Sequence, residues 1–411
     1  MNDRENMPLE ELVGKIFEQL AAEGFSEGTI GQYERIFGRL KKMASSLGKE
    51  LYDRELADKF IQDDSYHRGN GEGHCHSRYL YHVRCIHFIE SYINEGIVDW
   101  SITHPLPAKK LKSEKLRLCY EKFKTSLAED GLKPNTIDGY VRFVFYFLSY
   151  LEDKGLVSLS QVKSGDITFF MVLVCQEHYT PTSLGSHATG LRKFVRMFTE
   201  ISAFDSEIPD RLPKKYGITP SYTEKEHEKI DKCLVNSGMS SRDRAIALIA
   251  FETGLRAVDI CKLKIEDIDW SHDVIHIRQE KTREPLRIPL QISVGNALMA
   301  YLLEERPSSD SPYVFLRSIA PFRPLADHAS IYNVFRKILK DAAVEPDGRI
   351  SGSRMTRHSY ASRMLRNGVP LPVIADALGH NSPNSTMRYL ATDEKMMAAC
   401  TLPIPKEAHH E

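Results

Sequence analysis

A chain of 411 residues, 42% hydrophobic and 27% charged, has the composition of a soluble globular protein with two or three domains. It contains no apolar run long enough to span a membrane and no signal peptide at its start, so we expect a cytoplasmic protein with no membrane partner. Seven scattered cysteines without a Cys-x-x-Cys motif favour reduced thiols over a disulfide framework.

The net charge of −1 is small for a protein that binds nucleic acid, but the charge is unevenly distributed along the chain. Residues 1–105 carry a net charge of −6, residues 106–220 a net charge of +4, and residues 221–411 a net charge of +1. Proteins grip DNA mainly through its phosphates, so the basic middle segment is the part best suited to that contact.

Helical periodicity dominates the first part of the chain. Apolar residues recur at the spacing of one helix face, and Thr29 is the expected N-cap of the second helix. The helical patterns cover residues 8–48 (two helices), 52–63 and 77–94.

The second segment of the chain repeats the first. Residues 24–35 align with residues 131–142 at an offset of 107, and the two stretches share Gly, Thr, Ile, Tyr and Arg. The repeat predicts two copies of one four-helix unit, in residues 1–105 and 106–202.

Residues 203–221 hold three prolines and lack helical periodicity, which predicts an interdomain linker. A mixed α/β domain, mostly helical, is expected in residues 222–395, followed by a tail in 396–411. Residues 273–289 are predicted to form a β-hairpin, because both arms are β-branched and apolar. The expected helices of this domain are 223–236, 240–253, 256–263, 291–304, 329–342, 354–367 and 370–379.

The predicted domain places cationic side chains at several separate positions. Arg256 follows a turn at Gly254 and lies three residues before Asp259, whose carboxylate could orient it. Lys281 lies at the tip of the predicted hairpin, where a long ammonium side chain can reach a ligand.

The end of the domain adds an arginine pair, a histidine and a tyrosine. Arg354 and Arg357 are spaced to share one helix face, and His380 follows a Leu-Gly turn nine residues before Tyr389. One guanidinium group can bind two phosphate oxygens at once, and it stays charged at any working pH. This set of side chains suits an anionic substrate attacked by a tyrosine.

The order Arg, hairpin Lys, Arg-x-x-Arg-His, Leu-Gly-His, Tyr resembles the tyrosine recombinase (phage integrase) family, over about residues 222–395. Each motif alone is more often a surface charge or a core residue, but the ordered set is specific. By this resemblance, the catalytic residues are Arg256, Lys281, Arg357, His380 and Tyr389.

The resemblance implies a DNA strand transferase that needs neither metal nor ATP and therefore no cofactor. Its tyrosine attacks the scissile phosphate and forms a 3′-phosphotyrosine, leaving a free 5′-hydroxyl. The implied partners are double-stranded DNA with a specific recombination site, further copies of the chain in a tetrameric synapse, and in some cases an accessory protein.

One position departs from the family pattern. The second motif usually reads His-x-x-Arg, but here Arg354 occupies the histidine position. Arginine can bind phosphate but cannot exchange a proton at neutral pH, so the change alters the proton inventory more than the phosphate pocket.

The second four-helix unit resembles the core-binding domain of the family. Its candidate phosphate contacts are Lys133, Thr136, Tyr140 and Arg142. The alternative is that Tyr140 belongs to the core and Arg142 is a solvated charge.

Three other features of the sequence each allow two interpretations. The acidic first unit could bind separate DNA sites or, as its carboxylates favour, a protein. The tail could dock on a neighbouring protomer or on its own domain. The stretch His74-Cys75-His76 could hold a metal but lacks the spacing of a zinc finger, so no metal site is predicted.

Three functions are compatible with the sequence. A site-specific recombinase or integrase of a mobile element leads, because the doubled helical unit departs from the short two-domain type that resolves chromosome dimers. A catalytically weakened DNA-binding relative is supported only by Arg354. An enzyme like a type IB topoisomerase shares the phosphotyrosine chemistry but relaxes one duplex instead of exchanging strands between two.

Overall fold

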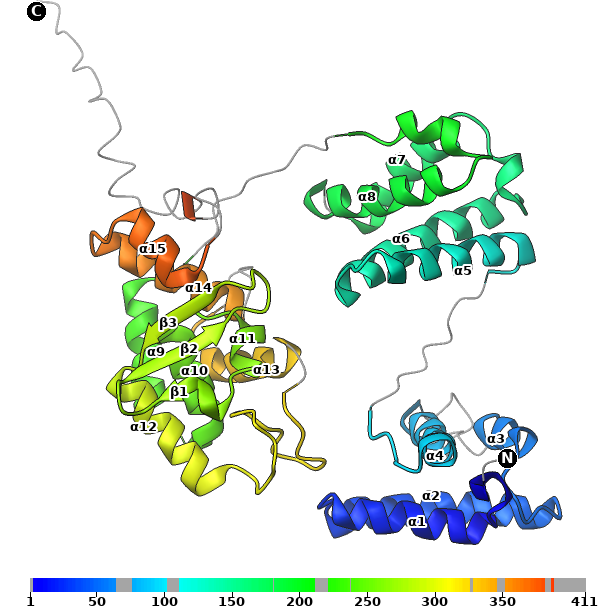
Figure 1. Ribbon diagram of the computed structural model, residues 1–411, viewed down its shortest axis with the longest axis horizontal. Helices are drawn as coiled ribbons and strands as arrows, with labels where there is room; N and C mark the ends of the chain where they lie inside the picture. The colour runs from blue at the N-terminus through cyan, green and yellow to red at the C-terminus, as the bar shows by residue number, and fades with distance from the viewer. Residues whose placement is uncertain are drawn as a thin grey trace, which may run out of the picture. The chain divides into compact units, whose positions relative to one another are not determined.

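The computed structural model describes residues 3–63, 76–101, 111–179, 181–210, 221–236, 238–325, 328–345, 352–380 and 386–387 (Figure 1). The protein is mainly helical with one small antiparallel sheet, which confirms the predicted fold class. Residues Leu106–Gly217 form one compact unit, and Met1–Pro105 with Ile218–Glu411 form the other. Among the helices that the structure describes, none is both long and apolar enough to cross a lipid bilayer.

The N-terminal helices surround a core of their own. Its aromatic members include Tyr33, Phe37, Phe60, Phe88 and Trp100, all buried. Phe88 meets Trp100 edge to face with ring centroids 4.9 Å apart, a favourable arrangement of aromatic quadrupoles. The helices are α1 (Leu9–Ala22), α2 (Glu27–Ser46), α3 (Arg54–Ile61) and α4 (His76–Glu95), after a 3₁₀ turn, η1 (Asp3–Asn6).

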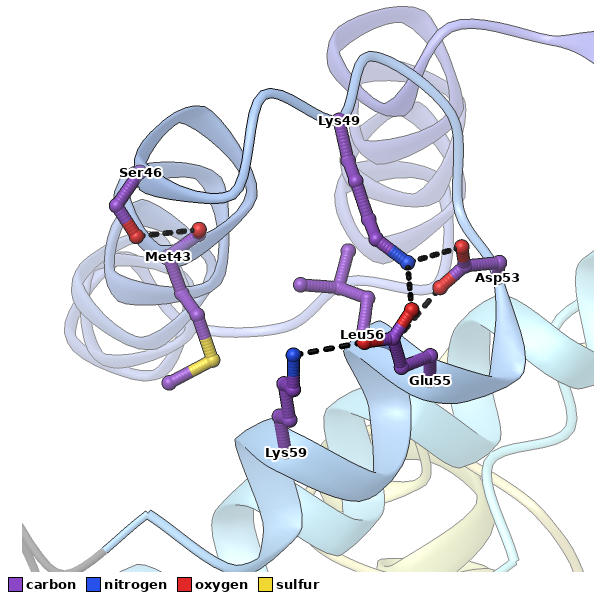
Figure 2. A network of polar contacts seen from close by, with 7 residues as sticks. All are labelled: Met43, Ser46, Lys49, Asp53, Glu55, Leu56 and Lys59. Atoms are coloured by element: carbon purple, nitrogen blue, oxygen red, sulfur yellow. Dashed lines mark hydrogen bonds and ion pairs between the residues drawn. The ribbon is translucent and has the colours of Figure 1, made fainter.

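Charged side chains fix the start of α3 (Figure 2). Asp53 caps the helix, since its Oδ1 accepts a hydrogen bond from the Leu56 amide at 2.7 Å. Lys49 pairs with Asp53 and also with Glu55, which is 2.7 Å away, and Lys59 pairs with Glu55 at 2.7 Å. Because these pairs are exposed, the cap contributes more to the stability of α3 than the ion pairs do.

The second unit has an equivalent set of helices around a core rich in phenylalanine. α6 is 20 residues long, as is α2, and their first residues are related by the offset of the sequence repeat. Gly190 in α8 lets this helix approach α6, since a Cβ there would lie 2.6 Å from the Tyr140 ring. The elements are α5 (Glu114–Glu129), α6 (Pro134–Asp153), η3 (Leu159–Gln161), α7 (Asp166–His178), α8 (Pro181–Met197) and η4 (Ser202–Glu207).

The C-terminal part is built around α10, which packs against the helices on every side of it. Ala245, Ile246, Ile249 and Ala250 of α10 are fully buried, as expected for a helix whose residues 245–251 are all apolar. The helices are α9 (Glu224–Asn236), α10 (Ser241–Thr253), α11 (Ala257–Cys261), α12 (Ile292–Ala300), α13 (His328–Asp341), α14 (Ser353–Arg366) and α15 (Leu371–Leu378).

A three-stranded antiparallel sheet of order β1-β2-β3 accompanies these helices. β2 (Val274–Arg278) pairs with β3 (Pro285–Pro289) in the predicted hairpin, with Ile275 opposite Ile288. A two-residue strand, β1 (Ile268–Asp269), adds to the other edge of β2. It follows a 3₁₀ turn, η5 (Ile265–Asp267).

Two predicted helices of the C-terminal part differ from the observed helices by more than one residue at an end. The helix expected to start at Arg256 starts at Ala257, with Arg256 as its N-cap in extended conformation. The helix expected over 291–304 ends at Ala300 and continues as a π-helical turn, η6 (Tyr301–Glu305).

Two predictions lie outside the described residues, namely the His74-Cys75 loop and the 396–411 tail. Of the predicted linker, the structure describes residues 203–210 and Ser221, and η4 occupies its first residues. The domain boundaries remain a prediction.

Candidate active site

The turn between α10 and α11 positions Arg256. Gly254 ends α10 in the left-handed conformation, with φ of 63°, and a Cβ on it would lie 2.7 Å from the Tyr360 ring. Only glycine satisfies both conditions without strain. Arg256 therefore leaves the turn at a fixed point with its side chain about four-fifths buried, at 21% exposure.

Gln279, directly after β2, holds the Arg256 guanidinium. This glutamine is fully buried, and its Oε1 accepts hydrogen bonds from Arg256 Nη1 at 2.6 Å and from the Thr282 hydroxyl at 2.9 Å. Its Nε2 donates to the carbonyl of Leu378, at the end of α15, at 2.9 Å. Nothing in the sequence marks Gln279 as a functional residue, because it is neutral and lies just after the strand, beyond its alternating pattern.

Asp259, the predicted partner of Arg256, is farther from it than Gln279 is. Its Oδ2 lies 4.0 Å from Arg256 Nη1, at the limit of an ion pair, and its Oδ1 accepts from the Glu280 amide at 2.8 Å. Burial raises the pKa of Asp259, and the Glu280 amide and the two arginines oppose that effect. Asp259 thus anchors the hairpin turn and adds a second, weaker contact to Arg256.

Arg357 lies in the first half of α14 and is only 8% exposed. Its Nη1 donates to the Gly254 carbonyl at 3.0 Å, and its Nη2 donates to the Leu378 carbonyl at 2.7 Å. The Leu378 carbonyl therefore accepts from both Arg357 and Gln279. Through this one oxygen the structure links the two arginines that are 101 positions apart in number, Arg256 and Arg357.

His380 follows α15 across Gly379, which ends that helix with φ of 61°. Its Nδ1 is 2.8 Å from the Thr386 hydroxyl, and its backbone amide donates to Ala375 at 2.9 Å. Burial first, then Arg357, Arg256 and His358, lower the pKa of His380 to about 4. The imidazole is therefore neutral at pH 7, and the positive charges of the two arginines favour this neutral form.

Lys281 lies two residues after Gln279 in the turn between β2 and β3, and it is exposed. The turn is closed by hydrogen bonds from the Arg283 amide to Gln279 at 2.8 Å and from the Gln279 amide to Glu284 at 2.9 Å. The Lys281 ammonium group therefore extends from a short turn closed by two backbone hydrogen bonds. Gln279, at the start of this turn, is hydrogen-bonded to Arg256.

Arg354 and Arg357 share α14 but differ in environment. Arg354 is exposed in the first turn, and within the described part of the chain it makes no hydrogen bond or ion pair. Arg357 is the arginine that the structure joins to Arg256. Tyr389, the predicted nucleophile, lies outside the described residues, as do residues 381–385.

The candidate DNA contacts of the second unit are spread over the start of α6. Lys133 and Arg142 are exposed, and Thr136 is half-buried. Tyr140 is half-buried and packs against the core of that unit beside Gly190. Lys133 and Arg142 are thus the more accessible of the four for a phosphate.

A cavity of about 820 Å³ opens between β3 and α15. Arg287, Asp376 and His380 are among its lining residues. Of the predicted catalytic residues that the structure describes, only His380 lines it. Arg256 and Arg357 are not among its lining residues.

Comparison with known proteins identifies the family to which this chain is similar. A profile of the Phage integrase family matches residues 221–396. The putative integrase/recombinase y4gC of Sinorhizobium fredii is 36% identical over 185 residues, which are 44% of this chain and 94% of that protein. Tyrosine recombinase XerA of Pyrococcus furiosus is 29% identical over 295 residues, which are 70% of this chain and 92% of that protein.

Solved structures share the fold at low sequence identity. The XerH recombinase bound to a palindromic difH substrate matches with a TM-score of 0.56 and 19% identity, covering 71% of this chain and 89% of that one. A lambda integrase dimer bound to a core site matches with a TM-score of 0.50 and 18% identity, covering 71% of this chain and 99% of that one. The chain belongs to the phage integrase, or tyrosine recombinase, family of enzymes that break and rejoin DNA through a tyrosine.

Proposed function

We propose that this enzyme is a site-specific recombinase of a mobile element, and that Arg256 and Arg357 bind the scissile phosphate. The observation that carries the proposal is the shared Leu378 carbonyl, which brings Gln279 and Arg357 together and places Arg256 one hydrogen bond away. Two guanidinium groups held in this way suit the two non-bridging oxygens of one phosphodiester.

The proposed reaction combines the two arginines with Tyr389 as the nucleophile. Tyr389 attacks phosphorus, the bond to the 5′ oxygen breaks, and the strand remains joined to the protein as a 3′-phosphotyrosine. Because the phosphodiester bond is exchanged for a phosphotyrosine bond, rejoining needs no ATP. The arginines offset the negative charge that builds up on the non-bridging oxygens in the transition state.

The protons have separate carriers. Lys281, on the turn after Gln279, donates a proton to the leaving 5′ oxygen. His380 is neutral at pH 7 because its pKa is about 4, so it can accept a hydrogen bond or a proton near the phosphate. A phosphate anion beside Arg256 and Arg357 offsets their charge and moves the pKa of His380 back up.

Double-stranded DNA with a specific site is the substrate, and a tetramer on two sites is the active assembly, with an accessory protein as a further candidate partner. XerH and lambda integrase were both solved on DNA sites, the latter as a dimer. Since the substrate is DNA, we place the enzyme in the cytoplasm.

The middle unit, with its net charge of +4, supplies further phosphate contacts. Lys133 and Arg142 are the leading candidates because both are exposed, Lys133 as the N-cap of α6 and Arg142 within that helix, and Thr136 is a third. Tyr140 contributes by packing. The acidic first unit, residues 1–105, contacts a partner protein in this proposal.

A covalent trap tests the proposed function. The protein is incubated with fragmented DNA from its own source, denatured, and captured with any linked fragments, whose ends are sequenced. Linked fragments that share one junction would support the proposal and identify the site. DNA binding without linked fragments would favour a binding-only protein, and relaxation of plasmids without a preferred junction would favour a topoisomerase.

Lys281→Ala is expected to slow cleavage of ordinary DNA by about 10²- to 10⁴-fold, because the leaving 5′ oxygen loses its acid. A substrate with sulfur at that bridging position should be cleaved at nearly the wild-type rate, since a thiolate leaves without a proton. Lys264→Ala, which removes an exposed ion pair with Glu266, is the control. Absence of rescue by sulfur would exclude Lys281 as the acid.

Arg354→His is expected to keep or raise the cleavage rate, because it restores a group that can exchange protons. Arg354 is exposed in the first turn of α14, so the free energy of unfolding should change by less than about 0.5 kcal/mol. Single-turnover cleavage and thermal melting measure the two effects. Complete loss of cleavage in a folded variant would assign Arg354 a role that histidine does not fill.

A further inference from the structure

We propose that Gln279 is a positioning residue of the active site, which sets the Arg256 guanidinium and the Lys281 turn relative to the Arg357 side. The inference rests on the proposed function, since it concerns how the phosphate-binding arginines are held. It adds a neutral, fully buried side chain to the charged residues that the motifs identify.

The hydrogen bonds of Gln279 connect three segments that are distant in sequence. Its carbonyl oxygen takes Arg256 Nη1 at 2.6 Å and the Thr282 hydroxyl at 2.9 Å, and its amide nitrogen donates to Leu378 at 2.9 Å. The first contact reaches the α10–α11 turn, the second the hairpin turn, and the third the end of α15. One side chain thus fixes the distances among the segments that carry Arg256, Lys281 and His380.

Gly379 provides independent support for this role. A Cβ on Gly379 would lie 2.8 Å from Gln279 Oε1 and 2.9 Å from Nε2, so any other residue would displace the amide. The φ of 61° at Gly379 also favours glycine. The turn before His380 is therefore shaped to admit the Gln279 amide beneath it.

An amide suits this position better than a carboxylate. Glutamate at 279 could accept the hydrogen bonds from Arg256 and Thr282, but it could not donate to the Leu378 carbonyl. It would also form a close ion pair with Arg256 and compete with the phosphate for the guanidinium charge. The neutral amide orients the guanidinium and leaves its charge for the substrate.

The nearby Asp259 does not replace Gln279 in this role. Its carboxylate is 4.0 Å from Arg256, compared with 2.6 Å for Gln279, and burial raises its pKa. Without Gln279, Arg256 would keep only this longer contact with Asp259. Its guanidinium group would then no longer be held in the position that binds the phosphate.

The test uses the full chain and a nicked duplex that carries the junction recovered by the covalent trap. Gln279→Ala is expected to lower the single-turnover cleavage rate by about 10- to 100-fold, the effect of a misplaced binding group, while DNA affinity changes little. Gln279→Glu keeps both acceptor contacts but turns an oxygen toward the Leu378 carbonyl, so it should be slowed at least as much. Cleavage by each variant is measured at a temperature at which thermal melting shows that variant to be folded. Gln291→Ala is the matched control because Gln291 is exposed and makes no cap bond to α12.

A second substrate separates positioning of Arg256 from general loosening of the fold. A methylphosphonate at the scissile position removes one non-bridging oxygen and its charge, so the contribution of Arg256 falls in the wild type as well. If Gln279 acts through Arg256, the gap between wild type and Gln279→Ala should shrink to within about threefold on this substrate, less than 1 kcal/mol. An undiminished gap would assign Gln279 a merely structural role and overturn the inference.

The two failures are distinguishable. A wild-type chain that forms no covalent adduct with any DNA would remove the proposed function. A wild-type chain that cleaves, together with a folded Gln279→Ala variant that cleaves equally fast, would overturn the positioning role and leave the function standing.

Discussion

Tyr389→Phe is expected to abolish covalent attachment to DNA while leaving DNA binding almost unchanged. Phenylalanine keeps the ring and removes the phenol oxygen, which is the atom that would bond to phosphorus. Arg256 and Arg357 remain in place, so the phosphate contacts that contribute to binding are retained. Denaturing gels of protein with labelled junction DNA measure the adduct, and gel shifts measure the binding.

Tyr360 is the control for this prediction, because it lies against Gly254 in the same region. Burial raises the pKa of the Tyr360 phenol, which makes it harder to ionise and therefore a weaker nucleophile. Tyr360→Phe should retain adduct formation. Adducts that persist in Tyr389→Phe but vanish in Tyr360→Phe would reverse the assignment.

The ordered motifs of the C-terminal part predicted the family, because the chemistry demands charged or ionisable side chains that are visible in a sequence. Helix positions also followed from periodicity, and the glycine at 254 marked the end of α10 because a left-handed residue needs glycine there. The β2–β3 hairpin followed from its β-branched arms.

The contacts that join the motifs could not be predicted from the sequence. Gln279 acts through a side-chain amide whose partners lie 23 and 99 positions away, and neither distance leaves a periodic signal. The two residues of β1 are too few to show alternation. The prediction of Thr29 as an N-cap was wrong, since Ser26 is the N-cap and its side chain accepts from the Thr29 amide. Both residues are good caps, and only the backbone conformation distinguishes them.

Arg357→Lys is the second substitution with a large expected effect, although it conserves charge. The two Nη groups of Arg357 reach two different carbonyls, those of Gly254 at 3.0 Å and Leu378 at 2.7 Å. A single ammonium group lacks the planar fork needed to hold both and present further donors to a phosphate. A buried carbonyl left without its donor costs about 1–3 kcal/mol, so thermal melting should register a loss of stability.

The cleavage rate should fall further than stability alone explains, by about 10²- to 10³-fold, the effect of removing a donor that stabilises transition-state charge. Arg366→Lys, on the exposed side of the same helix, is the matched control, because an ammonium group there can still pair with Glu224. Single-turnover cleavage is measured at a temperature where both variants are fully folded. If Arg357→Lys then cleaved like Arg366→Lys, charge alone would suffice at this position, and the paired contact to Gly254 and Leu378 would serve the fold and not the phosphate.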